Sequence, residues 1–298
     1  MPPLRSLLFA PGNHPRRVAK ALTLAADVVV LDLEDACPTA EKVATRSVVV
    51  DALQGPRVSL GYVRINALTT EFAYGDLLAV VRPGVDGIML TKVESADQVR
   101  TADWLISQLE RERGLPAGAI DLLPLVETGR GFAALSPIAA ACSRVRRLAF
   151  GAGDFTTDLG IAWSSDETEL VSFRSALVLA SRAAGLEPPI DLAWIRLNDS
   201  QGFARSVQWG RTLGFQGKLC IHPDHIGAIN AAFTPNDAQV AQARRIVEAF
   251  WESEALGTAA IQVDGMLVDY PIVRQAERVL ERARQIAARS AAARHNET

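Results

Sequence analysis

Short runs of apolar residues alternate with longer amphipathic stretches along most of the chain. Each run is rich in Val, Ile and Leu, has the length of a strand and is bounded by turn-forming residues. Near-continuous apolarity of this kind indicates strands that are buried on both faces, as in parallel sheets. We therefore predict about eight strands, at Leu4–Phe9, Asp27–Leu33, Val58–Ile65, Gly87–Leu90, Ile120–Val126, Leu148–Gly151, Ile190–Ile195 and Lys218–Ile221.

The stretches between these runs have the periodicity of helices. In one of them Ala102, Ile106 and Leu109 recur at helical spacing. We predict helices over Ala96–Glu110 and Glu167–Ala184, among others. About eight strand–helix units in about 230 residues is what a TIM (β/α)8 barrel requires. A doubly wound parallel sheet is the alternative fold.

The pattern changes after the eighth run, so we expect a barrel domain over residues 1–233 and a C-terminal helical extension over 234–298. No Gly/Ser-rich linker divides the barrel region. The extension is predicted to contain a helix start at Thr234–Pro235, a helix over Asp237–Glu252, a turn-like segment at Gln262–Pro271 and a long helix over Ile272–Arg289.

The composition excludes several classes of protein. The chain has 298 residues, of which 49% are hydrophobic and 22% charged, so it can bury a sizeable core. The net charge of −3 gives no electrostatic reason to expect binding to nucleic acid or to a membrane surface. Cys37, Cys142 and Cys220 lie far apart and form no CxxC pair, and no apolar run has the length of a membrane span. We expect a cytoplasmic protein without disulfides or a zinc site.

Polar residues follow most of the predicted strands at the point where each strand ends. The C-terminal ends of parallel strands meet at one mouth of a barrel, where barrel active sites form. Polar residues at strand ends also meet water in any barrel, so a single one carries little information. The set consists of Asp32, Glu34, Asp35, Arg64, Asn66, Lys92, Glu94, Glu127, Asp154 and His222.

Glu127 and Asp154 are the best candidate metal ligands. Each follows an apolar run directly and lies beside glycines that allow a close approach of the backbone. Two carboxylates, with water and substrate completing the coordination, suit Mg²⁺ rather than zinc. Glu34 and Asp35 could orient metal-bound waters. They could equally be acids at the start of a helix or on the surface.

Other signals are weaker. Gly151-Ala152-Gly153 begins like a dinucleotide-binding fingerprint, but Thr156 occupies the third glycine position. The chain has no GxxxxGK[ST] or GxSxG motif, which argues against a nucleotide hydrolase and gives no context for a serine hydrolase. Arg16, with Arg17 and Lys20 nearby, could bind phosphate or form a solvated helix face.

Taken in order, these residues resemble the citrate lyase beta-subunit-like family of acyl-CoA lyases. That family includes malyl-CoA and citramalyl-CoA lyases and belongs to the aldolase/citrate lyase superfamily of TIM barrels. The resemblance covers nearly the whole chain and rests on eight ordered motifs. They are RSLLFAPGNHPRR, VVLDLEDACP, YVRIN, GIMLTKVES, PLVETGRG, LAFGAGDFTTDLG, GKLCIHPDHI and VDGMLVDYP. Thr91 departs from the proline that we expect in the fourth motif.

The resemblance implies roles for individual residues. Glu127 and Asp154 match the ligands of Mg²⁺, for which Mn²⁺ is an alternative, and Arg64 matches the arginine that holds the oxo-acid part of the substrate. In such a site the backbone N–H groups of Gly151, Ala152 and Gly153 could act as further donors to developing negative charge.

The resemblance also implies contacts outside the barrel mouth. Arg16 and Lys20 match positions that contact the phosphates of coenzyme A. Asp269 matches an acid/base carboxylate that a neighbouring subunit contributes, which implies a homo-oligomer, a trimer or a dimer of trimers. The alternative for Asp269 is that it caps local backbone.

The expected activity is a Mg²⁺-dependent carbon–carbon lyase reaction. A 3-hydroxyacyl-CoA such as malyl-CoA or citramalyl-CoA would be split into an acyl-CoA and a small 2-oxo acid, or formed from them. Three alternatives stay open: a thioesterase of the same acyl-CoA, a citrate lyase beta subunit that acts on an acyl-carrier-protein thioester, and a catalytically silent binding subunit.

Overall fold

The computed structural model describes residues 3–295, and the backbone forms two compact units. One unit comprises Leu4–Asn230 and the other begins at Ala231. Within residues 3–295 no helix is long and apolar enough to cross a membrane, and Cys37, Cys142 and Cys220 are free.

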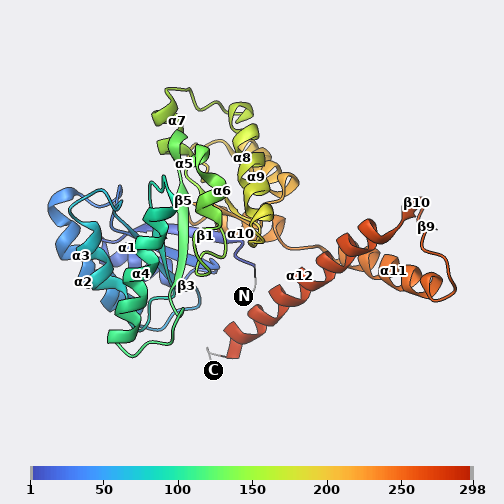
Figure 1. Cartoon of the computed structure of the whole chain (residues 1–298), viewed down its shortest axis with the longest axis horizontal. Helices are drawn as coiled ribbons and strands as arrows, with labels where there is room; N and C mark the ends of the chain where they lie inside the picture. Colours follow the sequence, from blue (N-terminus) through green and yellow to red (C-terminus); the bar gives the residue numbers. More distant parts are fainter. Residues whose placement is uncertain (1–2, 296–298) are drawn as a thin grey trace. The chain divides into compact units, whose positions relative to one another are not determined.

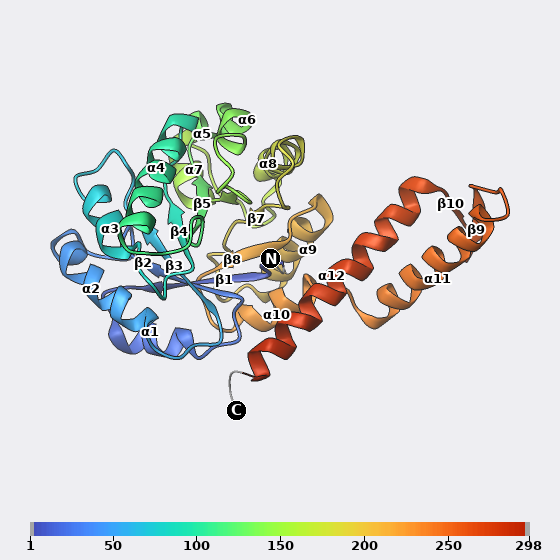
Figure 2. The ribbon, with the colours of Figure 1, turned by 60° about the horizontal axis from the view of Figure 1, so that its bottom comes forward.

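The first unit is a closed barrel of eight parallel strands in sequential order, as Figures 1 and 2 show. Pairing between the first and the eighth strand closes the sheet, which confirms the predicted TIM barrel and rules out the doubly wound sheet. The strands are β1 (Ser6–Pro11), β2 (Val28–Asp32), β3 (Leu60–Ile65), β4 (Gly87–Leu90), β5 (Asp121–Val126), β6 (Ala149–Phe150), β7 (Ile190–Asp191) and β8 (Gly217–Cys220).

Helices follow the strands and surround the barrel (Figure 2). Two of them, α4 and α8, correspond to the helices predicted at 96–110 and 167–184. The helices of this unit are α1 (Pro15–Leu22), α2 (Lys42–Leu53), α3 (Ala73–Val80), α4 (Ala96–Glu112), α5 (Gly129–Ala133), α6 (Leu135–Ala139), α7 (Ala152–Leu159), α8 (Val171–Ala183), α9 (Ser200–Leu213) and α10 (His225–Ala232), with short 3-10 turns η1 (Thr39–Glu41) and η2 (Thr168–Leu170).

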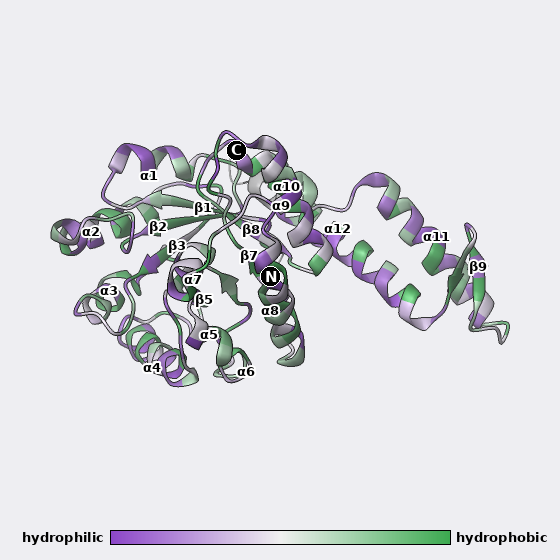
Figure 3. Cartoon of the chain, turned by 90° about the horizontal axis from the view of Figure 1, so that it is seen from above, coloured by the Kyte–Doolittle hydropathy of each residue, from purple (hydrophilic) through white to green (hydrophobic). Residues whose placement is uncertain are grey.

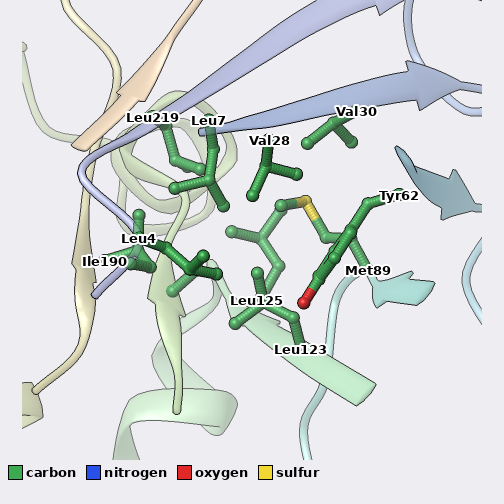
Figure 4. Close-up of a cluster of buried hydrophobic side chains, with 11 residues drawn as sticks. Leu4, Leu7, Val28, Val30, Tyr62, Met89, Leu123, Leu125, Ile190 and Leu219 are labelled. Atoms are coloured by element: carbon green, nitrogen blue, oxygen red, sulfur yellow. The ribbon is translucent and has the colours of Figure 1, made fainter. Parts of the chain in front are cut away.

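The barrel interior is a packed apolar core (Figure 4). Its buried side chains come from every strand, because each strand supplies an alternate residue to the inside. The outward-facing residues of the same strands pack under the helices, so the strands are apolar on both faces; much of the strand ribbon is accordingly green in Figure 3. The inward set comprises Leu4, Leu7, Val28, Val30, Tyr62, Met89, Leu123, Leu125, Ala149, Ile190 and Leu219.

The strand at β7 is shorter than the apolar run predicts. The run extends over Ile190–Ile195, but only Ile190 and Asp191 pair with neighbouring strands. The rest of the run leaves the sheet, and Ala193 and Ile195 line a cavity at the barrel mouth. The apolar run therefore contains both residues of the strand and residues that line the cavity, and the sequence alone does not distinguish the two.

A buried ionic network joins the barrel to its helices, and it was not predicted from the sequence. Asp191 on β7 accepts hydrogen bonds from Arg174 on α8 (2.8 Å) and from Lys218 on β8 (2.7 Å). Arg174 also donates to Glu167 (2.7 Å), and all four side chains are at most 1% exposed. The network contains two positive and two negative charges, so they balance within the dry interface.

The second unit contains two helices joined by a hairpin: α11 (Asp237–Glu254), β9 (Ile261–Val263), β10 (Met266–Val268) and α12 (Tyr270–His295). The start predicted at Thr234–Pro235 is wrong, because Asn236 caps α11 in a capping box with Gln239. The turn-like segment predicted around Gly265 is an antiparallel hairpin. Its Asp264–Gly265 turn has positive φ at both residues, the conformation that an Asp-Gly pair favours.

Candidate active site

A cavity of about 240 Å³ lies at the C-terminal ends of the barrel strands. It has a charged side, supplied by the ends of β2, β3, β5 and β6, and an apolar side, supplied mainly by β1, β7 and β8. Asp32, Asp35, Arg64, Glu127 and Asp154 form the charged side. The apolar side includes Phe9, Phe150, Trp163, Ala193, Ile195, Leu219 and Ile221.

Arg64 is the centre of the charged side. Its Nε donates to Oδ1 of Asp32 (2.7 Å) and its Nη2 to Oδ2, which makes a bidentate pair. Its Nη1 lies 3.1 Å from Oε2 of Glu34 and 3.3 Å from Oδ2 of Asp35, and the guanidinium stacks over the ring of Phe9. These carboxylates raise the pKa of Arg64 against the opposing effect of burial. The guanidinium is therefore a fixed positive charge in the cavity wall.

The register of the sheet explains the bidentate pair. Asp32 and Arg64 are directly paired positions on the neighbouring strands β2 and β3. From the sequence, Asp32 was predicted only as a residue at a strand end, without a partner. The pair could have been predicted from one signal: an acid ends one predicted strand, and an arginine lies near the end of the next.

A buried lysine holds the loop that follows β2. Nζ of Lys42 donates to the main-chain oxygens of Leu33 (3.0 Å) and Glu34 (2.6 Å) and to Oδ1 of Asn66 (2.7 Å). Asn66, just after β3, in turn donates to Asp76 on α3 (2.7 Å). Lys42 was not predicted as a site residue, because nothing in the local sequence distinguishes a buried lysine in the first turn of a helix from a solvated one.

Glu127 and Asp154 come from adjacent positions around the mouth. Glu127 follows β5 and is 2% exposed, while Asp154 lies in the first turn of α7 with a side chain that is 36% exposed. Burial and the negative charge of Asp154 raise the pKa of Glu127 well above its usual value. A Cβ atom at Gly151 would lie only 2.3 Å from Oε2 of Glu127, so a glycine is required there.

Lys92 lies among the acids of the cavity. Its main-chain N–H donates to Oε1 of Glu127 (2.8 Å), and its Nζ donates to Oε1 of Glu34. Nζ also lies 3.5 Å from Oδ2 of Asp154 and 3.7 Å from Oδ1 of Asp35. Burial opposes the charged form, but the hydrogen bond and charge of Glu34 raise the pKa of Lys92.

Glu34 and Asp35 have different environments although they are neighbours in sequence. Burial raises the pKa of Glu34 to about 7, against the opposing charge of Arg64. For Asp35 burial also acts upward, but the hydrogen bond with Glu34 and the charges of Arg64 and Lys92 lower the pKa. Asp35 is 55% exposed and Glu34 only 7%, so Asp35 is the more accessible carboxylate.

The donor set at the mouth fits a hard divalent cation. Glu127 and Asp154 offer carboxylate oxygens, and the upward effect of Asp154 on the pKa of Glu127 reflects a repulsion that a cation between them would relieve. Among residues 3–295 no three His, Cys, Asp or Glu side chains form a complete metal-binding cluster. The remaining coordination positions would fall to water and substrate oxygens, as Mg²⁺ prefers.

The glycines after β6 differ in what they offer. The N–H of Gly151, predicted as a donor to substrate, donates to the main-chain oxygen of Val126 (3.0 Å) and so already has an acceptor within the chain. Ala152 and Gly153 lie in the first turn of α7, where N–H groups have no acceptor within the helix. A Cβ at Gly153 would meet nothing within 4 Å, so the surroundings of Gly153 are open.

Comparison with known proteins places the chain among its relatives. Residues 5–223 match the model of the HpcH/HpaI aldolase/citrate lyase family. The chain belongs to this family. It is 36% identical to citrate lyase subunit beta of Leuconostoc mesenteroides subsp. cremoris (94% of this chain, 93% of the relative) and 33% identical to the L-malyl-CoA/beta-methylmalyl-CoA lyase of Rhodobacter capsulatus (94% of each).

Solved structures of the HpcH/HpaI aldolase/citrate lyase family agree with the fold. The protein CitE of Mycobacterium tuberculosis, in complex with magnesium, acetoacetate and coenzyme A, matches with a TM-score of 0.76 and 32% identity (94% of this chain, 98% of that chain). The same protein with magnesium and pyruvate matches with a TM-score of 0.69 and 30% identity (93% of this chain, 98% of that chain). The resemblance to the citrate lyase beta-like family and the assignment as a lyase are confirmed.

Not all predicted site residues of this family member lie in the cavity. Arg16 and Lys20 are exposed on α1, which follows β1 after the loop that begins at Gly12. His222 forms a weak contact with Asp224 (3.7 Å), and Glu94 lies 4.0 Å from Arg130. Glu94 and His222 are therefore not part of the charged side.

Asp269 belongs to the second unit, between β10 and α12. Its Oδ1 accepts the N–H of Ile272 at 3.4 Å, a long contact, and its main-chain oxygen accepts the N–H of Val273. These contacts are those of a helix-capping residue, which was the alternative considered from the sequence. The carboxylate is only partly buried, so capping leaves it accessible to another group.

Proposed function

We propose that this protein is a Mg²⁺-dependent carbon–carbon lyase that cleaves, or forms, a 3-hydroxyacyl-CoA such as malyl-CoA or citramalyl-CoA. The products would be an acyl-CoA and a small 2-oxo acid. The observation that carries the proposal is that one cavity contains a fixed guanidinium and two repelling carboxylates, from Arg64, Glu127 and Asp154. The names of the relatives support it, since they include a malyl-CoA lyase and a protein crystallised with magnesium and coenzyme A.

The charged side suits recognition of a 2-oxo acid. Arg64 would bind the carboxylate of the oxo acid, because a guanidinium held by Asp32 presents its remaining N–H donors at a fixed position. Glu127 and Asp154 would hold Mg²⁺, with Mn²⁺ as an alternative; when bound, the ion would supply Lewis-acid stabilisation of the oxygen that becomes the carbonyl. The N–H groups of Ala152 and Gly153 would add donors near this oxygen.

Cleavage requires the hydroxyl proton to leave, the carbon–carbon bond to break and the thioester enolate to take up a proton. The apolar side of the cavity would limit access of water to the enolate. We propose Asp269 as the acid that protonates the enolate carbon, contributed by a neighbouring subunit of a homotrimer or a dimer of trimers. Arg16 and Lys20 would bind the phosphates of coenzyme A at the edge of the mouth.

A single assay tests the function. Purified protein is incubated with Mg²⁺ and either malyl-CoA or citramalyl-CoA, and acetyl-CoA, glyoxylate, pyruvate and free CoA are separated by chromatography. Acetyl-CoA with an equimolar 2-oxo acid is the expected result, and Glu127→Gln should abolish it. Free CoA without an oxo acid would indicate a thioesterase instead, and no turnover of either substrate would contradict the proposal.

A citrate lyase beta subunit is the second candidate, because three relatives with that name are 34–36% identical over 94% of this chain. Such a subunit would act on an acyl-carrier-protein thioester within a complex. Copurification with partner subunits, together with turnover of a citryl thioester on carrier protein and none of the CoA thioesters, would favour this function.

A further inference from the structure

The main chain at Lys92 has an unusual conformation. Its φ is +48°, and among residues 3–295 only Glu167 and Asp264 share positive φ without being glycine. Asp264 lies in a hairpin turn that favours this conformation, whereas lysine has no side-chain group that stabilises it locally. A non-glycine residue in the left-handed region persists only where the surroundings determine it.

The neighbours of Lys92 hold it in this conformation. Thr91 Oγ1 donates to the main-chain oxygen of Ile65 on β3 (3.0 Å). The N–H of Val93 donates to the main-chain oxygen of Leu125 on β5 (3.3 Å). The chain is thus tied to one neighbouring strand just before Lys92 and to the other just after it.

The consequence of this conformation is a contact with Glu127. The N–H of Lys92 meets Oε1 of Glu127 at 2.8 Å, while Oε2 lies over Gly151, where only a hydrogen atom fits. One carboxylate oxygen is occupied by the main chain of Lys92, and the orientation of the whole group is thereby fixed. The ammonium of the same residue lies between Glu34 and Asp154.

We infer that Lys92 is a positioning residue for the metal site, and that it acts through its main chain. Its left-handed backbone directs the N–H to Oε1 of Glu127 and so presents Oε2 to the cation. The ammonium has a separate effect: it balances the charge of Glu34 and Asp154 and competes with a cation at Asp154. This inference rests on the proposed role of Glu127 and Asp154 as metal ligands.

Substitutions at this one position separate the two effects. Lys92→Gly removes the ammonium but accepts positive φ at no steric cost, so the N–H contact is kept. Lys92→Val removes the ammonium and opposes positive φ, because a β-branched side chain is strongly disfavoured there. Lys92→Asn and Lys92→Leu form a second matched pair, since asparagine tolerates the left-handed region and leucine does not. This second pair is used if Lys92→Val does not fold.

The Mg²⁺ affinity of each purified variant is measured without substrate by titration calorimetry. Circular dichroism checks that each variant is folded. We expect Lys92→Gly and Lys92→Asn to bind Mg²⁺ at least as tightly as the unaltered protein, because a competing cation is gone. Lys92→Val and Lys92→Leu should bind about 10- to 100-fold more weakly than their partners, the usual cost of losing a group that orients a ligand.

Glu127→Gln, titrated alongside, distinguishes two kinds of failure. Equal affinities within each matched pair, with binding lost in Glu127→Gln, would overturn the role of Lys92 alone. Unchanged binding in Glu127→Gln, or no binding by the unaltered protein, would overturn the metal site itself and this inference with it.

Discussion

Replacing Arg64 by lysine tests whether the charged side of the cavity needs a guanidinium or only a positive charge. Arg64 donates to both oxygens of Asp32 and also faces Glu34 and Asp35. A lysine ammonium can keep the charge, but it cannot make two parallel hydrogen bonds to one carboxylate. The side chain is only 11% exposed, so water would not replace the lost contact fully.

The size of the effect follows from these contacts. Arg64→Lys loses at least one charged hydrogen bond to Asp32, which is about 1.5–3 kcal/mol. It also loses the fixed donors that we propose bind the 2-oxo acid, and removing one such preorganised donor lowers kcat by about 10²–10³-fold. We therefore expect kcat/KM for the 2-oxo acid in the condensation direction to fall by about 10²–10³-fold. The KM for acyl-CoA should change much less, because its phosphates would bind elsewhere.

Arg144→Lys is a matched control. Arg144 is 7% exposed and pairs with Asp103 (2.6 Å) and Glu110 (2.7 Å), but it does not line the cavity. Both substitutions should lower the free energy of unfolding to a similar extent, as measured by urea denaturation. Only Arg64→Lys should lower kcat/KM. Near-normal kcat/KM in Arg64→Lys, or equal losses in both variants, would refute the assignment of Arg64 as the oxo-acid anchor.

Three further predictions concern positioning, stability and assembly. Lys42→Met should lower kcat/KM by about 10²-fold, because the loop after β2 loses its three hydrogen bonds; a fall in Tm with normal kinetics would contradict this. Asp191→Asn should cost about 3–5 kcal/mol in urea unfolding, because it leaves Arg174 and Lys218 without their shared carboxylate in a dry interface, and a loss below about 1 kcal/mol would refute the estimate. Mixing inactive Asp269→Asn with inactive Glu127→Ala under subunit exchange should restore some activity, because a mixed oligomer can combine an intact metal site with an intact Asp269. If exchange is demonstrated and no activity returns, the subunits do not share Asp269.

The barrel was predictable from the sequence because parallel strands that are buried on both faces have short, nearly continuous apolar sequences. Eight short apolar runs match eight strands, and β4 agrees at both ends with the predicted Gly87–Leu90. The hairpin of the second unit was less visible. Its strands are three residues long and half of their residues are exposed, so they leave no clear apolar pattern, and the sequence predicted only a turn-like segment over Gln262–Pro271.

The candidate site was predictable to the extent that its residues lie at strand ends. Glu127, Asp154 and Arg64 line one cavity because the C-terminal ends of parallel strands converge. The pairing of Arg64 with Asp32 needed the register between β2 and β3, and the hydrogen bonds of Lys42 needed the path of a loop. Strand register and the path of a loop depend on contacts between residues that are distant in sequence, and a single sequence contains little information about such contacts.

The distribution of charge around the mouth indicates how several acids can lie together. Five carboxylates in a partly dry cavity would repel one another, so their negative charge needs nearby positive charge. They are those of Asp32, Glu34, Asp35, Glu127 and Asp154. Two lysines and one arginine do this in different ways. Arg64 pairs with Asp32 on β2 and with the two acids just after that strand. Lys42 stabilises the backbone of the loop that carries those two acids, and the ammonium of Lys92 contacts Glu34, Asp35 and Asp154. Glu127 is the exception: within residues 3–295 its direct hydrogen-bond donor is the main-chain N–H of Lys92, and its pKa remains raised. Glu127 is one of the two carboxylates proposed to bind the cation, and a carboxylate without a cationic side chain in direct contact is expected where a bound ligand neutralises part of the charge.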